Sequence, residues 1–177
     1  MKESRIDMDL RRYIRDVPDF PKKGIVFKDI TPLLKDRGAL EYALITLSER
    51  FRDRGISKVV GIESRGYIFA PAIALSLKAG FVPVRKPGKL PWKTVAEEYA
   101  LEYGTDRLEV HVDALVPGER VLIVDDLLAT GGTASATRRL VERLQGNVIG
   151  AGFLVELTFL EGRARLPGLE IVSLIDY

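Results

Sequence analysis

The chain has 177 residues, no cysteine, one histidine and a formal net charge of +2, with 46% hydrophobic and 29% charged residues. This length and composition suit one soluble globular domain, residues 1–177. The absence of cysteine excludes disulfides and thiolate chemistry and fits a reducing cytoplasm. The single histidine excludes a metal site built from several histidines. The positive charge is too small and too scattered to favour nucleic-acid binding. No apolar run could span a membrane, and no export signal is visible. We therefore expect a cytoplasmic protein that binds neither nucleic acid nor membrane.

The first predicted element is a short helix over residues 8–17, where Leu10, Ile14 and Val17 have helical spacing. Two prolines and a glycine then interrupt regular structure. The apolar piece 25–27 that follows them is too short for a long strand. We expect it to pack as a lid on the core, a role that does not exclude contact with a ligand.

The next elements are a helix over 39–52, a buried strand over 58–62 and a helix over 67–77. The loop between the last two has the sequence E-S-R-G. Its Arg65 could bind an anion with its guanidinium fork, together with the amides of the turn. On its own, an ordinary surface arginine in a turn is the more common explanation.

A third strand is predicted over 81–85, and a long basic segment hinged by proline and glycine follows it. An exposed hairpin arm is predicted next, with strands over 95–103 and 108–112. Long loops of this kind are often lids, and a basic lid would suit a polyanionic ligand. A solvated arm whose charges keep an edge strand soluble explains the pattern about equally well.

The most informative stretch begins with the apolar run 121–124, which predicts a strand that is buried on both faces and ends at Asp125 and Asp126. The sequence A-T-G-G-T and a helix pattern follow. Two glycines let the backbone turn tightly, and the start of a helix offers unpaired N–H groups to an anion. The two acids would repel a phosphate but could accept hydrogen bonds from ribose hydroxyls. Each part also occurs in ordinary strand–helix connections, but their order favours a ribose 5-phosphate site.

Two further strands are predicted over 147–158 and 171–174, the first near the centre of the sheet. Strands that alternate with helices predict an α/β fold with a mostly parallel central sheet flanked by helices. Ligands bind such sheets beyond the carboxyl ends of the strands, and all three candidate loops follow strand ends. The loops can therefore converge on one site.

The segment V-L-I-V-D-D-L-L-A-T-G-G-T resembles the motif with which type I phosphoribosyltransferases bind phosphoribosyl pyrophosphate (PRPP), and its ending is most similar to the adenine phosphoribosyltransferase family. Other segments are similar to that family in the same order: P-K-K-G-I-V-F-K-D-I-T-P to its hood, G-I-E-S-R-G-Y to its pyrophosphate loop, and R-K-P-G-K-L-P with Y-A-L-E-Y-G to its catalytic loop. The resemblance implies the type I fold with an N-terminal hood over about 1–35, a flexible lid over 85–112, and a homodimer.

The resemblance also assigns roles to particular residues. It implies that ribose 5-phosphate and PRPP are bound by Asp125, Asp126, Ala129, Thr130, Gly131, Gly132 and Thr133. It implies that pyrophosphate is bound by Ser64, Arg65, Arg85, Lys86 and Lys89. The implied adenine contacts are Val26, Phe27, Arg65 and Leu127, and the implied catalytic residues are Glu102 and Tyr103.

The implied reaction is purine salvage, in which adenine and PRPP give AMP and pyrophosphate. Mg²⁺ would be held mainly by substrate oxygens, without a dedicated protein site. Ala129 stands in the region where relatives of the hypoxanthine type have a catalytic Asp, so Glu102 would act as the acid–base group. The alternatives are a phosphoribosyltransferase for another purine and, less favoured, a PRPP-binding regulator without activity.

Overall fold

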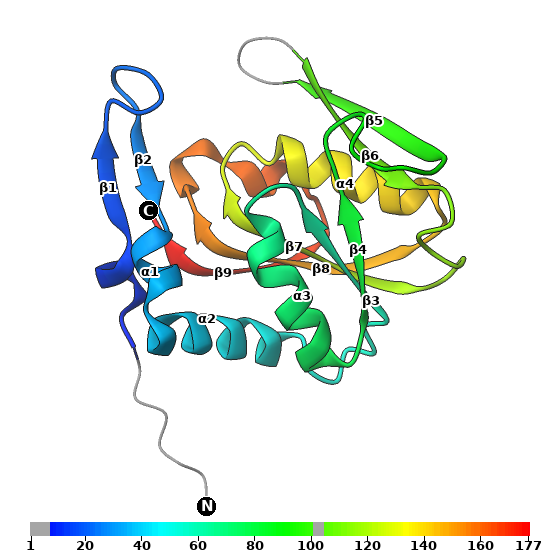
Figure 1. Cartoon of the computed structure of the whole chain (residues 1–177), viewed down its shortest axis with the longest axis horizontal. Coiled ribbons are helices and arrows are strands. Elements are labelled where there is room, and N and C mark those ends of the chain that lie inside the picture. Colours follow the sequence, from blue (N-terminus) through cyan, green and yellow to red (C-terminus); the bar gives the residue numbers. More distant parts are fainter. Residues whose placement is uncertain (1–7, 101–104) are drawn as a thin grey trace, which may run out of the picture. The chain divides into compact units, whose positions relative to one another are not determined.

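A computed structural model describes residues 8–100 and 105–177, which form two compact units divided within one helix: residues 1–46 and residues 47–177. No helix in the described ranges is both long and apolar enough to cross a bilayer. Figure 1 labels the elements along the chain.

The first unit contains a small antiparallel sheet and short helical segments. Its two strands pair with Arg15 opposite Asp29 and Pro18 opposite Val26. The elements are η1 (Leu10–Tyr13), β1 (Arg15–Pro18), β2 (Val26–Asp29), α1 (Thr31–Lys35) and the first part of α2 (Arg37–Arg50). The predicted helix over 8–17 is therefore wrong beyond its first turn. Because β1 can pair its backbone with β2, tertiary hydrogen bonds override a weak helical pattern.

The second unit is built on a five-stranded parallel sheet with the order β4-β3-β7-β8-β9. This confirms the predicted α/β fold with a mostly parallel sheet. Its strands and long helices are β3 (Lys58–Ile62), α3 (Gly66–Leu77), β4 (Gly80–Val84), β7 (Arg120–Leu128), α4 (Gly132–Arg143), β8 (Asn147–Glu156) and β9 (Glu170–Asp176). Strand β8 lies inside the sheet as expected, but the middle position belongs to β7.

Two short 3-10 helices, η2 (Thr158–Leu160) and η3 (Gly162–Arg165), lie between β8 and β9, and a separate antiparallel pair, β5 (Thr94–Ala100) and β6 (Thr105–His111), forms the predicted arm. Within the arm, Tyr99 lies opposite Asp106 and Thr94 lies opposite His111. The structure thus confirms a hairpin arm within the described residues.

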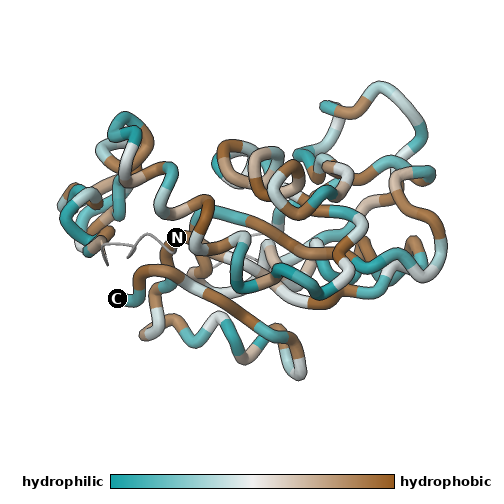
Figure 2. The backbone as a smooth tube through the Cα atoms, turned by 90° about the horizontal axis from the view of Figure 1, so that it is seen from below, coloured by the Kyte–Doolittle hydropathy of each residue, from teal (hydrophilic) through white to brown (hydrophobic). Residues whose placement is uncertain are grey.

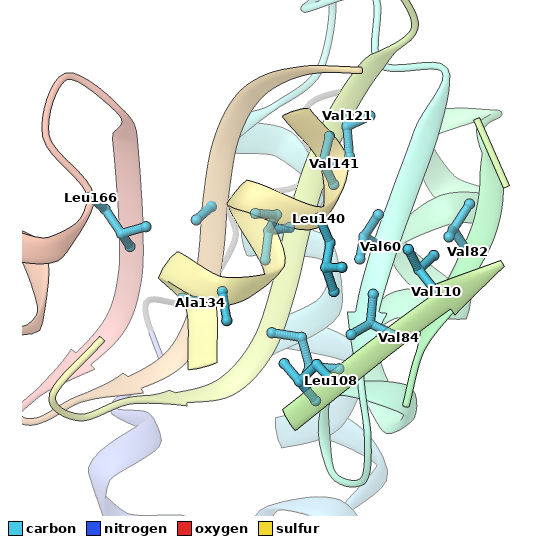
Figure 3. Packing of buried hydrophobic residues seen from close by; sticks show 14 of the residues in the cluster. Val60, Val82, Val84, Leu108, Val110, Val121, Ala134, Leu140, Val141 and Leu166 are labelled. Atoms are coloured by element: carbon cyan, nitrogen blue, oxygen red, sulfur yellow. The ribbon is translucent and has the colours of Figure 1, made fainter. Parts of the chain in front are cut away.

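Side chains alternate between the two faces of the sheet and decide which helices cover each face. Val60 and Ile62 of β3 belong to the hydrophobic cluster that also contains Leu140 of α4 and Leu108 and Val110 of the arm; Figure 3 labels all of these except Ile62. On the opposite face, Gly61 lies so close to α3 that an added Cβ would be 2.6 Å from the Ala70 Cβ. Figure 2 shows hydrophobic residues along the strands, as expected for a sheet covered on both faces.

The predicted end of the strand at Asp125 is wrong, because β7 continues to Leu128. The long apolar strand β8 supplies the partner: Asp125 pairs with Phe153 and Leu128 with Glu156. Continued pairing carries both aspartates to the carboxyl edge of the sheet as part of a strand, which holds them more rigidly than a loop would.

Candidate functional site

A pocket of about 280 Å³ opens at the carboxyl ends of the parallel strands, where α/β sheets bind their ligands. Three segments that follow β3, β4 and β7 contribute to it, and the arm adds one side chain. The lining residues are Glu63, Ser64, Arg65, Lys86, Tyr99, Asp125, Asp126, Leu127, Leu128, Ala129, Thr130, Gly131, Gly132, Thr133 and Ala134. The order of the parallel strands thus brings the loops that the sequence analysis identified to one pocket.

The turn from β7 into α4 has the geometry of an anion site. Gly131 caps α4 with φ +78°, a left-handed conformation that favours glycine. It also lies against Gly162, since an added Cβ on Gly131 would be 3.2 Å from the Gly162 Cα and would overlap its carbonyl oxygen. The first residues of α4, together with Thr130 and Thr133, line the pocket, and the first N–H groups of a helix have no partner within the helix. A phosphate would find several converging donors and the favourable end of the helix dipole there.

Asp125 and Asp126 form a tightly coupled acidic pair at the pocket wall. Burial raises the pKa of Asp125 well above its ordinary value, and the neighbouring Asp126 raises it further. Burial also raises the pKa of Asp126, although its ion pair with Arg65 at 2.8 Å opposes the shift. Asp125 lies against the start of α3, where an added Cβ on Gly66 would be 2.8 Å from the Asp125 Oδ1. The pair can therefore accept hydrogen bonds from neutral hydroxyls while remaining partly neutralised by the surrounding protein.

The loop after β3 is held by the segment after β4. Arg85 donates to both carboxylate oxygens of Glu63, at 3.1 and 2.9 Å, and the Lys86 amide donates to the same carboxylate at 3.1 Å. The Arg85 hydrogen bonds are the main reason that the pKa of Glu63 is lowered. Arg85 also donates to the Lys89 carbonyl oxygen at 3.0 Å. Arg85 therefore braces the loop that carries Ser64 and Arg65.

Lys86 points from the end of β4 toward the arm. Its ammonium donates to the Tyr99 hydroxyl at 3.2 Å and to the Asp106 carboxylate. The Tyr99 hydroxyl in turn donates to Asp106 at 3.0 Å. Burial alone would lower the pKa of Lys86, but the hydrogen bonds to Asp106 and Tyr99 outweigh it and raise the pKa above its ordinary value. Lys86 is thus a stable cation in the wall of the pocket.

A second ionic contact fixes the arm to α4, the helix that follows the turn from Ala129 to Gly131. Glu97 accepts hydrogen bonds from Arg139 at 2.6 Å and from Arg143 at 3.1 Å, and Arg143 also donates to the Ala96 carbonyl oxygen at 2.7 Å. These hydrogen bonds, chiefly the one from Arg139, lower the pKa of Glu97. The arm is therefore attached both to α4 and to the end of β4.

The pocket brings together most of the residues predicted to bind PRPP. Asp125, Asp126 and the whole turn from Ala129 to Thr133 line it, as do Ser64, Arg65, Lys86 and Leu127. The predicted pyrophosphate contacts Arg85 and Lys89 are not among its lining residues. Arg85 instead forms an ion pair with Glu63, which holds its guanidinium group away from the pocket lining.

Four other predicted residues do not enter this geometry. Glu102 and Tyr103 lie outside the described residues. Val26 and Phe27 belong to the first unit, where Phe27 makes an edge-to-face contact with Phe20 at 5.2 Å between ring centres. Their predicted contacts with adenine stay predictions.

Sequence reasoning missed three residues that shape the site: Glu63, Tyr99 and Asp106. Glu63 stands inside the quoted E-S-R-G loop, so its position was visible although its partner was not. Tyr99 and Asp106 were assigned only to the arm. The antiparallel register places them opposite one another, and an alternation count along both arm strands could have found this pairing.

Known proteins resemble this chain over nearly its whole length. The family model described as the phosphoribosyl transferase domain matches residues 33–165. The chain is 58% identical to the adenine phosphoribosyltransferase of Thermotoga petrophila over 170 residues, which are 96% of this chain and 100% of that protein.

Solved structures of adenine phosphoribosyltransferases also resemble this chain. The crystal structure of adenine phosphoribosyltransferase from Rhodothermus marinus is 57% identical, with a TM-score of 0.91 and coverage of 95% of this chain and 96% of that one. The adenine phosphoribosyltransferase of Trypanosoma brucei, solved in complex with AMP, pyrophosphate and ribose-5-phosphate, is 25% identical with a TM-score of 0.87, covering 96% of this chain and 80% of that one.

Proposed function

Because the chain belongs to the adenine phosphoribosyltransferase family, we propose that its pocket binds PRPP and adenine side by side for direct transfer. The enzyme transfers the 5-phosphoribosyl group of PRPP to adenine and releases AMP and pyrophosphate. One observation carries the assignment of the pocket: it joins an anion-binding turn, an acidic pair and two cations, Arg65 and Lys86, in a single wall. PRPP has a phosphate at one end, a pyrophosphate at the other and hydroxyls between them.

In this arrangement the amides and hydroxyls of the turn from Ala129 to Thr133 bind the 5-phosphate. Asp125 and Asp126 accept hydrogen bonds from the ribose hydroxyls and orient the anomeric carbon. Arg65 and Lys86 bind the pyrophosphate, and Arg85 acts on it indirectly by holding Glu63. Correct positioning of this kind and stabilisation of the leaving group supply much of the rate in such displacements.

The reaction breaks the bond between the anomeric carbon and a pyrophosphate oxygen and forms a bond to a ring nitrogen of adenine. That nitrogen loses its proton. By resemblance to the family, Glu102 takes the proton, and Tyr103 steadies the leaving group. Val26 and Phe27 bind the base by the same resemblance, with the aromatic ring stacked on the purine.

We propose Mg²⁺ as the cofactor, and the donor set of the pocket fits it. Asp125 and Asp126 present carboxylate oxygens, which are the ligands that Mg²⁺ prefers, and PRPP supplies further oxygens. The ion neutralises negative charge on the pyrophosphate when it is bound. The metal would thus be shared between substrate and pocket, with most ligands coming from the substrate and water.

We also propose that the enzyme is a homodimer and that α3 contributes to its interface. Ile68 and Leu75 lie two turns apart on one side of α3 and are 42% and 81% exposed, and Phe81 on the adjacent edge strand is 37% exposed. Exposed apolar groups of this size favour a protein partner. Sedimentation of the wild type should give a dimer and Leu75→Glu a shift toward monomer; a wild-type monomer at micromolar concentration contradicts the proposal.

The proposed location is the cytoplasm, because PRPP is highly charged and does not cross a bilayer unaided. An enzyme that consumes PRPP should therefore share the compartment in which it is made. Cell fractionation with antibody detection tests this, and recovery in the membrane or exported fraction would contradict it.

The experiment that tests the function is a panel of bases: protein, Mg²⁺ and PRPP with adenine, hypoxanthine, guanine or xanthine, followed by nucleotide formation. AMP from adenine alone is expected. Turnover with an oxopurine alone would preserve the PRPP site but contradict the proposed base site. PRPP binding without turnover of any base would indicate a regulator.

A further inference from the structure

Three cations in or beside the pocket are held in ion pairs within the protein. Arg65 pairs with Asp126 at 2.8 Å, Arg85 pairs with Glu63 at 2.9 Å, and Lys86 pairs with Asp106. The first two carboxylates belong to the sheet edge and its loops. Asp106 differs, because it reaches Lys86 from the arm.

The Lys86 ammonium has three N–H donors, and the arm occupies two of them. One points to the Tyr99 hydroxyl and one to Asp106, while the ammonium lies 5.7 Å from the centre of the Tyr99 ring. Tyr99 and Asp106 face each other across the arm, so that both contacts come from a single rung. A phosphate oxygen entering the pocket can therefore use one remaining donor, or it must replace Asp106.

We propose that Asp106 is the internal counter-ion of Lys86 and competes with pyrophosphate for it, so that Asp106 weakens the binding of PRPP and speeds the release of pyrophosphate. The proposal rests on the proposed role of Lys86 as a pyrophosphate ligand. Its physical basis is that one ammonium shared by two anions binds each less strongly, and that a fixed carboxylate near the pocket repels a polyanion. The carboxylate thereby keeps the product from becoming an inhibitor.

The position of Asp106 suits this role. Its side chain is partly buried, at 28% exposure, and Lys86 is also partly buried, at 39%, so water screens the pair only in part. Tyr99 is 6% exposed and donates to Asp106, which keeps the carboxylate in place when Lys86 turns toward a ligand. The lysine has a flexible stem and can move between the two anions.

The test is the inhibition constant of pyrophosphate against PRPP, at fixed Mg²⁺, in the variant Asp106→Asn. Asparagine keeps the size of the side chain and can still accept from Tyr99, but it removes the charge. We expect pyrophosphate to inhibit about 3- to 10-fold more strongly, the KM for PRPP to fall and the KM for adenine to stay unchanged. An inhibition constant that is unchanged or raised would overturn the proposal, because Asp106 would then only orient Lys86.

Glu98→Gln is the matched control. Glu98 is exposed on β5, the arm strand that carries Tyr99. Its side chain lies on the other face of that strand from its neighbour Tyr99. The substitution removes the same charge without touching Lys86, and pyrophosphate inhibition should stay at the wild-type value. Equal tightening in both variants would mean a general field of the arm and would also overturn the proposal.

Lys86→Met separates this inference from the proposed function. Alone it should weaken pyrophosphate inhibition, and in its presence Asp106→Asn should have no further effect. If Lys86→Met changes nothing, the pyrophosphate role of Lys86 is wrong; if it weakens inhibition while Asp106→Asn does not tighten it, only the counter-ion role is wrong. Asp106→Ser, measured in the same way, replaces Asp106→Asn if that variant does not fold.

Discussion

Gly131 and Gly162 approach each other so closely that neither position has room for a side chain. An added Cβ on Gly162 would lie 3.1 Å from the Gly131 amide nitrogen, 3.0 Å from a Leu128 methyl carbon and in overlap with the Ala129 carbonyl oxygen. The helical turn η3 thus packs directly against the backbone of the turn that leads from β7 into α4. The shape of that turn depends on a segment about thirty residues further along the chain.

Gly162→Ala tests this contact. The Cβ would meet backbone atoms, which cannot move aside as a side chain can, so we expect a loss of about 1–3 kcal/mol in the free energy of unfolding. The KM for PRPP should rise because the turn is displaced. Chemical denaturation and steady-state kinetics measure the two effects. Gly38→Ala is the control, since its nearest neighbour would be 3.5 Å away; wild-type stability and KM in Gly162→Ala would contradict the prediction.

The acidic pair predicts a pH dependence. The folded-state pKa of Asp125 lies above 3.8 because of burial and the neighbouring Asp126. A carboxyl group whose pKa is raised by folding contributes stability that is complete below its unfolded pKa and is lost as the pH rises through the folded pKa. The ligand-free protein should therefore gain stability from Asp125→Asn, and the gain should grow as the pH rises from 3.8 through the folded pKa. Thermal unfolding across this range measures the difference.

Ionisation of the same pair, which lowers the stability of the ligand-free protein, should strengthen the binding of PRPP. An ionised carboxylate accepts hydrogen bonds from ribose hydroxyls more strongly than a protonated carboxyl group does, so PRPP binding should strengthen as the pH rises through the pKa of the pair. Asp125→Asn should weaken PRPP binding and flatten this dependence. A variant that is more stable than the wild type and also binds PRPP equally well at every pH would contradict the assignment of Asp125 to the ribose site.

Arg163 and Glu156 predict a stability effect away from the pocket. Glu156 is 3% exposed and accepts hydrogen bonds from Arg163 at 2.7 and 2.6 Å. Arg163→Met leaves this buried carboxylate without its cation, and we expect a loss of about 2–4 kcal/mol, in the lower range because Arg163 itself is half-exposed. Denaturant unfolding measures the loss, and Arg138→Met, which breaks an exposed pair with Glu142, should change stability far less.

The pH dependence of the Glu156 effect has a defined sign. The hydrogen bonds from Arg163 are the main cause that lowers the pKa of Glu156 below 4.5. This stability is present above the unfolded pKa and is lost as the pH falls through the folded pKa. The difference between wild type and Arg163→Met should therefore shrink in acid; a difference that is constant with pH would mean that lost packing, not charge, causes it.

Glu102→Gln tests the acid–base role that the family resemblance implies. General acid–base help contributes about 10²–10⁴-fold, so kcat should fall by that order while PRPP binding stays nearly unchanged. Single-turnover kinetics and PRPP titration measure the two quantities. A kcat equal to that of the wild type would remove Glu102 from the mechanism.

Local sequence was sufficient for the strand over 58–62 and for the antiparallel arm, which the structure confirms. It failed at the N-terminus, where residues 15–18 form a strand because β2 is available to pair with them. It failed again at Asp125, which lies inside β7 because β8 extends the pairing. Both errors come from hydrogen bonds to distant strands, and a helical or apolar pattern within one segment carries no information about its partner.

The residues of the site likewise fall into those that a local sequence pattern predicted and those that only the folded chain brought together. The order of acids, glycines and hydroxyls in one segment by itself predicted residues that line the pocket, because turn geometry and helix-end chemistry are local properties. Only the tertiary structure decided that Arg85 pairs with Glu63, a lining residue of the pocket, and that Asp106 faces Lys86. These roles depend on which charges the folded chain brings within hydrogen-bonding distance. Charge pairing between segments follows from sheet order and strand register, which no single segment encodes.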